Sequence, residues 1–279
     1  MKILLFANTD WYLYNFRLPL AVELRNKGFD VVLVSPKGEF TNRLKENGFT
    51  VVNIDMDRSG TGIFKELVSI RSFYKIVRSQ SPDLIHNFTL KCVVYGSLIS
   101  CFFKSLKVVN AVAGMGYIFT DKSFKAKCLK IALILIFKIF MRGASQSLIL
   151  QNSHDMKFFI KNQILSPNNI FLIPGSGVNI EKFKPVDVKK NDNTNVIMAS
   201  RLLWSKGVKV LVDAAAIIVK EKRLNIHFHV AGASDPDNPA NISKEVLLEW
   251  RDRNNVSFLN RVEDMPALMK KMDIAVLPT

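Results

Sequence analysis

Cysteine is scarce in this chain of 279 residues, and what is missing excludes several protein classes. The three cysteines, Cys92, Cys101 and Cys128, are odd in number and form no CxxC pair. Neither a disulfide framework nor a zinc knuckle is therefore expected, and a reducing, cytoplasmic setting is favoured. No tandem repeat or low-complexity tract occurs, and 48% of the residues are hydrophobic. A chain of this length can form two globular domains.

No apolar run approaches the roughly 18 to 20 residues that a membrane-spanning helix needs. The longest runs cover residues 92–103 and 131–137. The amino-terminal residues MKILLFANTDWYLY also lack the apolar stretch and cleavage site of a signal peptide. They indicate a first buried strand, in a chain expected not to cross a membrane.

Acidic residues are missing from residues 122–154, and the whole chain carries a net charge of +15. Residues 1–180 hold 23 Lys and Arg against 11 Asp and Glu, so the first half is expected to face an acidic partner. An apolar segment here carries six cations: Lys122, Lys125, Lys127, Lys130, Lys138 and Arg142. The segment predicts either contact with an anionic membrane surface or a buried helix with solvated lysines at its ends. No nucleic-acid signature accompanies the charge, so no nucleic-acid partner is predicted.

Short strands alternate with helices along the whole chain. The first predicted unit has strands at 2–7 and 30–35 and a helix at 17–28, with Pro19 in its first turn and Gly28 past its end. Further strands are predicted at 50–56, 82–86, 107–114, 147–153, 195–200, 226–232, 256–260 and 273–278. The predicted class is α/β, with two Rossmann-like parallel sheets in domains 1–183 and 195–279 joined by a polar hinge at 184–194.

Ligands bind such sheets beyond the carboxyl ends of the strands, so the loops that follow the strands are the candidate sites. The first loop, NTDWYLYNFR, lacks the GxGxxG of a nicotinamide site. It offers Trp11, Tyr12 and Tyr14, followed by Asn15 and Arg17 at the start of the predicted helix. Aromatic faces stack on sugars and a helix start attracts anions, whereas the alternative is an aromatic staple that only holds the loop.

The histidines have structural interpretations beside functional ones. His86 is predicted to end the fourth strand, where it is either a packing residue or a catalyst. Asn152 and Asp155 have the spacing of a helix cap. His227 and His229 alternate on one strand and point to one face, but without a nearby carboxylate they are interpreted as structural, and no metal is predicted.

The loop MASRLLWSKG carries Arg201 and Lys206 directly after a predicted buried strand. They are either a solvated pair of cations or, as an Arg fork and a Lys point charge, the ligands of a diphosphate. Elsewhere the sequence lacks the paired carboxylates of glycosidases, a GxSxG elbow and a Walker loop, which argues against hydrolysis and ATP chemistry.

Eight motifs follow in a characteristic order: YNFRLPLAVELRNKGFDV, PDLIHNFTLKCVVYG, VNAVAGMGYIFT, LILQNSHD, IPGSGVNIEKFKP, SRLLWSKGV, VAGASDPDNPANIS and VSFLNRVEDMPALMKKMDIAVLPT. On them the chain resembles glycosyltransferase family 4, the retaining GT-B enzymes, and especially the branch that extends lipid-linked saccharides. The resemblance implies transfer from a nucleotide diphosphate sugar, expected to be a UDP-linked N-acetylhexosamine, to a polyprenyl-diphosphate saccharide in surface glycan synthesis. It also implies a peripheral place on the inner face of the cytoplasmic membrane, and no cofactor, metal or protein nucleophile.

The resemblance assigns roles to individual residues. Arg201 and Lys206 correspond to the catalytic cations that hold the donor diphosphate and offset its charge as the nucleotide leaves. The other donor residues it implies are Gly114, Met115, Gly116, Gly175, Ser176, Gly177, Val178 and Arg261. The acceptor residues it implies are Tyr14, Asn15, Arg17 and His86.

Two departures from the family pattern accompany the resemblance. Many relatives have a histidine at the position of Ala113, and the sequence ends at DIAVLPT, before the EGxP segment and the Glu-x7-Glu element that contact the donor. Little or no activity is therefore expected of this chain. Two alternative functions remain open: a GT-B epimerase of the UDP-N-acetylglucosamine 2-epimerase type, and a non-catalytic protein that binds a sugar nucleotide or a membrane.

Overall fold

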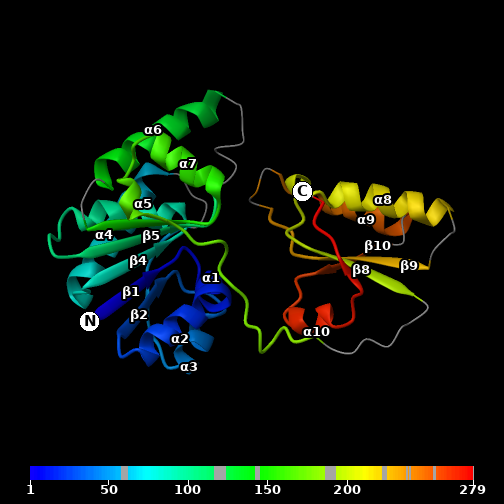
Figure 1. Ribbon diagram of the computed structural model, residues 1–279, viewed down its shortest axis with the longest axis horizontal. Helices are drawn as coiled ribbons and strands as arrows, with labels where there is room; N and C mark the ends of the chain where they lie inside the picture. The colour runs from blue at the N-terminus through cyan, green and yellow to red at the C-terminus, as the bar shows by residue number, and fades with distance from the viewer. Residues whose placement is uncertain are drawn as a thin grey trace. The chain divides into compact units, whose positions relative to one another are not determined.

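The structure is a computed structural model that describes residues 1–57, 62–115, 124–141, 145–185, 193–221, 225–236, 238, 240–253 and 256–278. The chain divides into two compact units, Met1–Gly177 and Val178–Thr279, each built on its own sheet (Figure 1). Within the predicted hinge, residues 186–192 lie outside the described residues.

The first unit holds a seven-stranded sheet in the order β3-β2-β1-β4-β5-β6-β7, and every pairing is parallel. This is the doubly wound strand order, extended by one strand. Its strands are β1 (Lys2–Phe6), β2 (Asp30–Ser35), β3 (Thr50–Asn53), β4 (Leu84–Phe88), β5 (Lys107–Val112), β6 (Gln146–Leu150) and β7 (Ile170–Leu172). The predicted α/β class with parallel sheets is confirmed, although the three-residue edge strand β7 was not predicted.

Helices cover both faces of this sheet. The elements between the strands are α1 (Asp10–Tyr12), the π-helical η1 (Leu13–Arg17), α2 (Leu18–Asn26), α3 (Thr41–Glu46), α4 (Ile63–Gln80), α5 (Leu90–Ser100), α6 (Phe124–Phe140), α7 (Ser153–Lys161) and the 3-10 turn η3 (Pro167–Asn169). Alternate residues of β1 face opposite sides, so Leu4 and Phe6 pack with α4 and α5, whereas Ile3 and Leu5 pack on the side of η1, α2 and α3.

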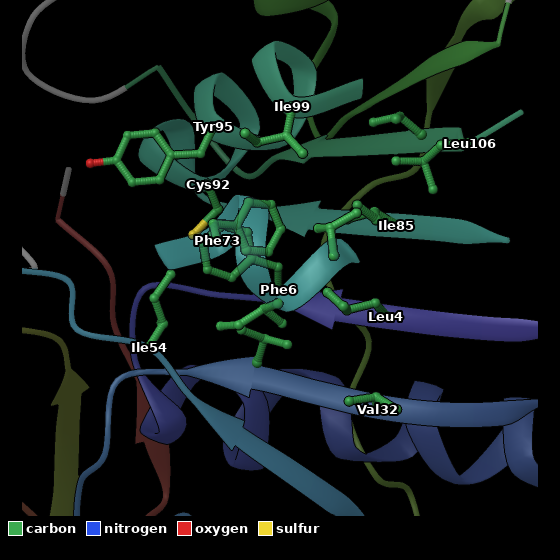
Figure 2. Packing of buried hydrophobic residues seen from close by; sticks show 14 of the residues in the cluster. Leu4, Phe6, Val32, Ile54, Phe73, Ile85, Cys92, Tyr95, Ile99 and Leu106 are labelled. Carbon is green, nitrogen blue, oxygen red and sulfur yellow. The ribbon is translucent and has the colours of Figure 1, made fainter. Parts of the chain in front are cut away.

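The core under α4 and α5 is buried and mostly aliphatic, with two stacked phenyl rings within it (Figure 2). The rings of Phe6 and Phe73 stack with centroids 4.0 Å apart, and Ile85 of β4 lies in the same cluster. Burial of each such side chain contributes about 2 kcal/mol, so this layer fixes how α4 sits on the sheet.

The first helix begins earlier than the predicted start at Arg17. The Oγ1 of Thr9 accepts a hydrogen bond from the backbone N–H of Tyr12, which caps a helix starting at Asp10. Pro19 would clash with the carbonyl group four residues before it in a regular α-helix, and the wider π-helical turn at Leu13–Arg17 removes this conflict. Arg17 therefore lies inside a continuous helical segment.

The second unit holds a four-stranded parallel sheet in the order β10-β9-β8-β11. Its elements are β8 (Thr194–Ala199), the 3-10 turn η4 (Trp204–Lys206), α8 (Val208–Glu221), β9 (Ile226–Ala231), α9 (Lys244–Arg253), β10 (Val256–Asn260), α10 (Met265–Met269) and β11 (Ile274–Ala275). One core cluster joins α8 and α9 to one face of the sheet. Among the described helices of both units, none has the length and apolar character needed to span a bilayer.

Candidate functional site

Arg201 and Lys206 lie on the loop that leaves the carboxyl end of β8, as the sequence predicted. Arg201 is half exposed, and its Nη1 donates to Oδ2 of Asp235 over 2.7 Å. Lys206 closes η4 and is followed by Gly207, whose φ of +74° and close approach to the Pro278 carbonyl group admit no side chain. The backbone therefore turns sharply after Lys206, and the cation stays near the sheet edge.

Arg261 follows β10 on the same edge of the second sheet. The residue before it, Asn260, has a positive φ of 54°, and its carbonyl group accepts a hydrogen bond from Gly232 over 2.8 Å. The loops after β8, β9 and β10 thus meet at one edge, which is where an open parallel sheet binds its ligand.

The remaining predicted donor residues belong to the first unit or to the join between the units. Gly175, Ser176, Gly177 and Val178 are exposed and follow β7, and the two compact units divide after Gly177. Gly114 is exposed after β5, whereas Met115 is buried in the core cluster shared by α5, α6 and β6. Gly116 lies outside the described residues.

Arg17 of the first unit packs against two aromatic rings. Its guanidinium carbon lies 4.4 Å from the ring centroid of Phe88 and 5.2 Å from that of Tyr12, and its Nη2 donates to the Tyr12 hydroxyl group over 2.6 Å. Its buried Nε has no hydrogen-bond partner, and no carboxylate of the described part of the chain forms an ion pair with it. A half-buried guanidinium whose hydrogen-bond and ring contacts, over the described residues, are all to aromatic side chains is suited to an incoming anion.

His86 lies beside Arg17, but it does not end its strand as predicted. β4 continues to Phe88 because that ring is buried, and His86 pairs with Leu5 and Val109 in the middle of the sheet. The His86 and Phe88 rings are 4.2 Å apart, and the buried Nε2 of His86 has no hydrogen-bond partner among the described residues. Burial, and then the charge of Arg17, lower the pKa of His86 to about 3, so the ring is neutral near pH 7.

Tyr14 and Asn15, the other two predicted acceptor residues, contact residues of their own or a neighbouring loop. The Tyr14 ring lies 5.1 Å from the Phe40 ring, and the Asn15 amide donates to the Trp11 carbonyl group over 2.9 Å. The structure thus brings Arg17 and His86 together, whereas Tyr14 and Asn15 hold the helical segment.

Asp10, to which the sequence assigned no role, fixes the loop after β1. Its buried carboxylate accepts hydrogen bonds from the backbone N–H groups of Trp11 and Phe40 and from the Thr41 hydroxyl group, at 2.7 to 2.9 Å. These contacts tie the loop after β1 to the loop after β2. The aspartate precedes an aromatic run, and only its position as an acidic residue in the first turn of a helix could have hinted at this role.

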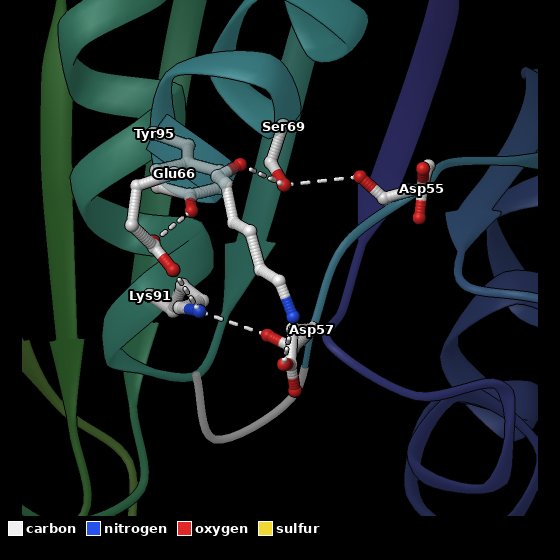
Figure 3. Close-up of polar contacts among 7 residues, drawn as sticks. Asp55, Asp57, Glu66, Ser69, Lys91 and Tyr95 are labelled. Atoms are coloured by element: carbon white, nitrogen blue, oxygen red, sulfur yellow. Dashed lines mark hydrogen bonds and ion pairs between the residues drawn. The ribbon is translucent and has the colours of Figure 1, made fainter. Parts of the chain in front are cut away.

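Glu66, Lys91 and Tyr95, which the sequence did not suggest as a group, join α4 to α5 at the start of α5 (Figure 3). Lys91 donates to Glu66 over 2.7 Å and to the carbonyl group of Asp57 over 2.8 Å, and the Tyr95 hydroxyl group donates to the other oxygen of Glu66. Burial, and then the hydrogen bond to the Glu66 carboxylate, raise the pKa of Tyr95. Both carboxylate oxygens of Glu66 are engaged, so the group acts as a clamp between the helices rather than as a base.

Asn152 and Asp155 form a helix cap, and His227 and His229 make structural contacts. The Asn152 side chain accepts the Asp155 N–H over 2.8 Å, which confirms the predicted helix cap. His227 and His229 share a face, with rings 4.9 Å apart, and contact Ser257 and Asn195. In the described part of the chain, no three His, Cys, Asp or Glu side chains gather as a metal site.

Two units, each a parallel sheet with cations on the loops that follow its strands, have the architecture of the GT-B fold class. Family models match both units: glycosyl transferase 4-like over residues 2–152 and glycosyl transferases group 1 over residues 193–279. The first match covers more than half of the sequence, and the chain belongs to the glycosyl transferase 4-like family.

Two curated relatives align with nearly the whole chain. The N,N'-diacetylbacillosaminyl-diphospho-undecaprenol alpha-1,3-N-acetylgalactosaminyltransferase of Campylobacter jejuni is 27% identical over 100% of this chain and 74% of its own length. The UDP-Gal:alpha-D-GlcNAc-diphosphoundecaprenol alpha-1,3-galactosyltransferase of Escherichia coli is 25% identical over 92% of this chain and 67% of its own length. The Anabaena protein HepE, solved with UDP and glucose, has the same fold, with a TM-score of 0.71, 18% identity, and coverage of 99% of this chain and 74% of that one.

Proposed function

We propose that the reaction served by this site is the transfer of a sugar from a UDP-sugar to a saccharide carried on a polyprenyl diphosphate, with the low activity of this chain that its sequence predicts. The observation that carries the proposal is the placement of Arg201 and Lys206 on one short loop at the carboxyl edge of the second sheet. The names of the two curated relatives support it, because both describe transfer to an undecaprenyl-diphosphate saccharide and one names UDP-Gal as the donor.

Binding of the donor diphosphate is proposed to depend on positive charge. In the transfer, a bond forms between an acceptor oxygen and the sugar C1, the bond from C1 to the phosphate oxygen of UDP breaks, and the hydroxyl proton passes to the departing phosphate. Negative charge then grows on the departing diphosphate, and the Arg201 guanidinium and the Lys206 ammonium group offset it. Two cations suffice for this role, so the proposal includes no metal or cofactor. Arg261, on the neighbouring loop, adds a third positive group to the donor end.

The acceptor end rests on Arg17. A half-buried guanidinium without a carboxylate partner among the described residues is stabilised when a phosphate of the lipid diphosphate pairs with it. Neutral His86 beside it adds polarity without adding charge. Within this proposal Tyr14 and Asn15 shape the loop, and Gly114, Met115 and the Gly175–Val178 segment contribute backbone and packing.

A membrane surface is the proposed location, on the inner face of the cytoplasmic membrane. Large apolar side chains line one exposed face of α6 at helical spacing: Phe124, Ile131, Leu135 and Ile139. Phe124 is 82% exposed, and Lys127 is exposed on the same helix. No acidic residue occurs between 122 and 154, so an anionic lipid surface is the partner that fits the charge. Of the six predicted cations, Lys122 and Arg142 lie outside the described residues.

The structure adds a second helix to this surface that the sequence did not suggest. The first turns of α4 expose Phe64, Leu67 and Val68, and Phe64 is 86% exposed. Helix α5 packs against both α4 and α6, so the three helices form one layer on the same face of the sheet (Figure 1). Two exposed apolar faces on one layer favour docking on a surface over a solvated helix.

Calorimetric titration with UDP tests the donor end. Arg201→Ala and Lys206→Ala should each weaken UDP binding by about tenfold or more, because each removes a charge-assisted contact to phosphate. Lys209→Ala is the matched control, since it removes one cation from the next turn, where Lys209 pairs with Asp213. Equal UDP affinity in all three variants would contradict the proposal.

Product analysis separates the proposed reaction from epimerisation. With UDP-N-acetylgalactosamine and a polyprenyl-diphosphate saccharide, transfer yields free UDP and a lipid longer by one sugar. A sugar nucleotide altered only at C2, formed without any acceptor, would favour the epimerase instead.

A further inference from the structure

We infer that Asp235 is a positioning residue that holds the Arg201 guanidinium in place for the donor diphosphate. The inference rests on the proposed function, because it concerns how one of the two donor cations is set. Asp235 belongs to the segment VAGASDPDNPANIS, which the sequence singled out without a role.

The two partners of the Arg201–Asp235 ion pair are buried to different extents. The Asp235 side chain is only 13% exposed, whereas the Arg201 side chain is 50% exposed, and Nη1 and Oδ2 are 2.7 Å apart. A mostly buried carboxylate needs a cation beside it, and this need fixes one end of the guanidinium. The guanidinium has five N–H donors in a rigid plane, so one fork can bind the carboxylate while others bind phosphate.

The backbone around Asp235 is locked to the Arg201 loop. A Cβ on Gly232 would lie 1.7 Å from the Ser200 carbonyl oxygen, so the two loops touch at a position where only glycine fits. The Leu202 N–H donates to the Ala233 carbonyl group over 3.1 Å. Arg201 lies between these two contacts, so the loops after β8 and β9 form one rigid edge.

The backbone of Asp235 is fixed on its own loop as well. Asn241 Oδ1 accepts hydrogen bonds from the Asp235 N–H and from the Ser234 hydroxyl group, both at 2.9 Å. Leu203 forms a bridge with the same Asn241, and the Ile242 N–H donates to the Leu202 carbonyl group over 3.0 Å. The position of Asp235 is therefore set before any ligand arrives.

The two donor cations differ in this respect. No ion pair holds Lys206 within the described residues, and its side chain is half buried at the end of η4. Of these two cations, Arg201 alone is held by a carboxylate among the described residues, so a change at Asp235 should affect UDP binding chiefly through Arg201.

Two opposing effects make the sign of the outcome informative. As a negative charge near a diphosphate, Asp235 repels the ligand, and Asp235→Asn would then tighten UDP binding. As the group that orders a long side chain in advance, Asp235 favours binding, and its loss would weaken it. The rigid loops and the short contact argue that the ordering is the larger effect.

Calorimetric titration with UDP on the full chain tests the inference. Asp235→Asn should weaken UDP binding about fivefold, because a charged hydrogen bond that orients Arg201 becomes a neutral one. Asp213→Asn is the matched control: it removes the same charge from the same unit, where Asp213 pairs with Lys209 on α8, and should leave affinity within about twofold. Asp235→Glu, which keeps a carboxylate, should bind UDP more tightly than Asp235→Asn.

A double variant separates positioning from misfolding. In an Arg201→Ala background, Asp235→Asn should cause no further loss of UDP affinity, since the side chain it orients is gone. An equal loss in both backgrounds, or an Asp235→Asn affinity no weaker than that of Asp213→Asn, would overturn the inference alone. Absence of UDP binding by the unchanged chain would overturn the proposed function, and the inference with it.

Discussion

His86 shows how one buried side chain links the acceptor end to the stability of the first unit. Its ring lies against Phe88, and Arg17 stands over the same phenyl ring. Within the part of the chain that the structure describes, the buried Nε2 has no hydrogen-bond partner. A protonated imidazole would add a second charge beside the guanidinium in a desolvated place. The folded unit therefore holds His86 neutral.

This has a consequence for the pH dependence of stability. The unfolded chain protonates His86 near its ordinary pKa of 6.5, whereas the folded chain does so only near 3. Between these values the unfolded state binds one proton more, so the free energy of unfolding falls by up to about 1.4 kcal/mol for each pH unit lowered. Hydrogen exchange of the amides of β1, β4 and β5 from pH 7 to 4 should show a steeper loss in the unchanged chain than in His86→Gln. Parallel losses would show that the pKa of His86 is not lowered.

Single residues also mark how much of the candidate site could be predicted. Arg201 and Lys206 were predicted because a loop after a buried strand is a local pattern. The pairing of Arg201 with Asp235, 34 positions away, was not, because it depends on how two neighbouring loops meet at the sheet edge. Arg17 was placed near a helix start, but its stack on Phe88 depends on the π-helical turn and on β4.

At the scale of elements, strands were easier to predict than their ends. The buried strands of both sheets are short apolar runs, and the parallel order followed from their alternation with helices. The start of the first helix and the end of β4 were wrong, since a cap at Thr9 and the burial of Phe88 decide them. The edge strand β7 escaped prediction because it is short and largely exposed.

The contact of α5 with the sheet depends on Gly96. A Cβ at this position would lie 2.1 Å from the side-chain nitrogen of Asn87, which donates to Asn110 over 2.8 Å. Asn110 in turn donates to Ser97 and Gln146, so a buried polar ladder crosses β4, β5 and β6 and cannot yield at one point.

Gly96→Ala should therefore destabilise the first unit by about 2 to 3 kcal/mol through overpacking. Gly114→Ala is the control, because a Cβ there meets no atom of the described residues within 4 Å. Differential scanning calorimetry should show a lower melting temperature for the first variant and little change for the second. Equal melting temperatures would mean that α5 can move away from the sheet without cost.

For the molecule as a whole, charge and apolar exposure are distributed unequally. Most of the excess of 15 positive charges lies in residues 1–180, and the first unit also carries the two exposed apolar helix faces of α4 and α6. The acceptor in the proposed reaction is a lipid, so the unit proposed to bind it is also the one suited to a lipid surface. Apolar insertion and attraction to anionic lipids should then act together.

Flotation with vesicles separates these two contributions. The chain should float with phosphatidylcholine vesicles only when they contain phosphatidylglycerol, and should be released as salt rises from ~0.1 M to ~1 M, where the Debye length falls to about 3 Å. Ile131→Gln with Leu135→Gln should lower the floated fraction, because both side chains are exposed on α6. Val210→Gln with Ile217→Gln, a similarly exposed pair on α8 of the second unit, should leave it unchanged. A chain that stays at the bottom with anionic vesicles, or equal losses in the two double variants, would rule out α6 as the docking helix.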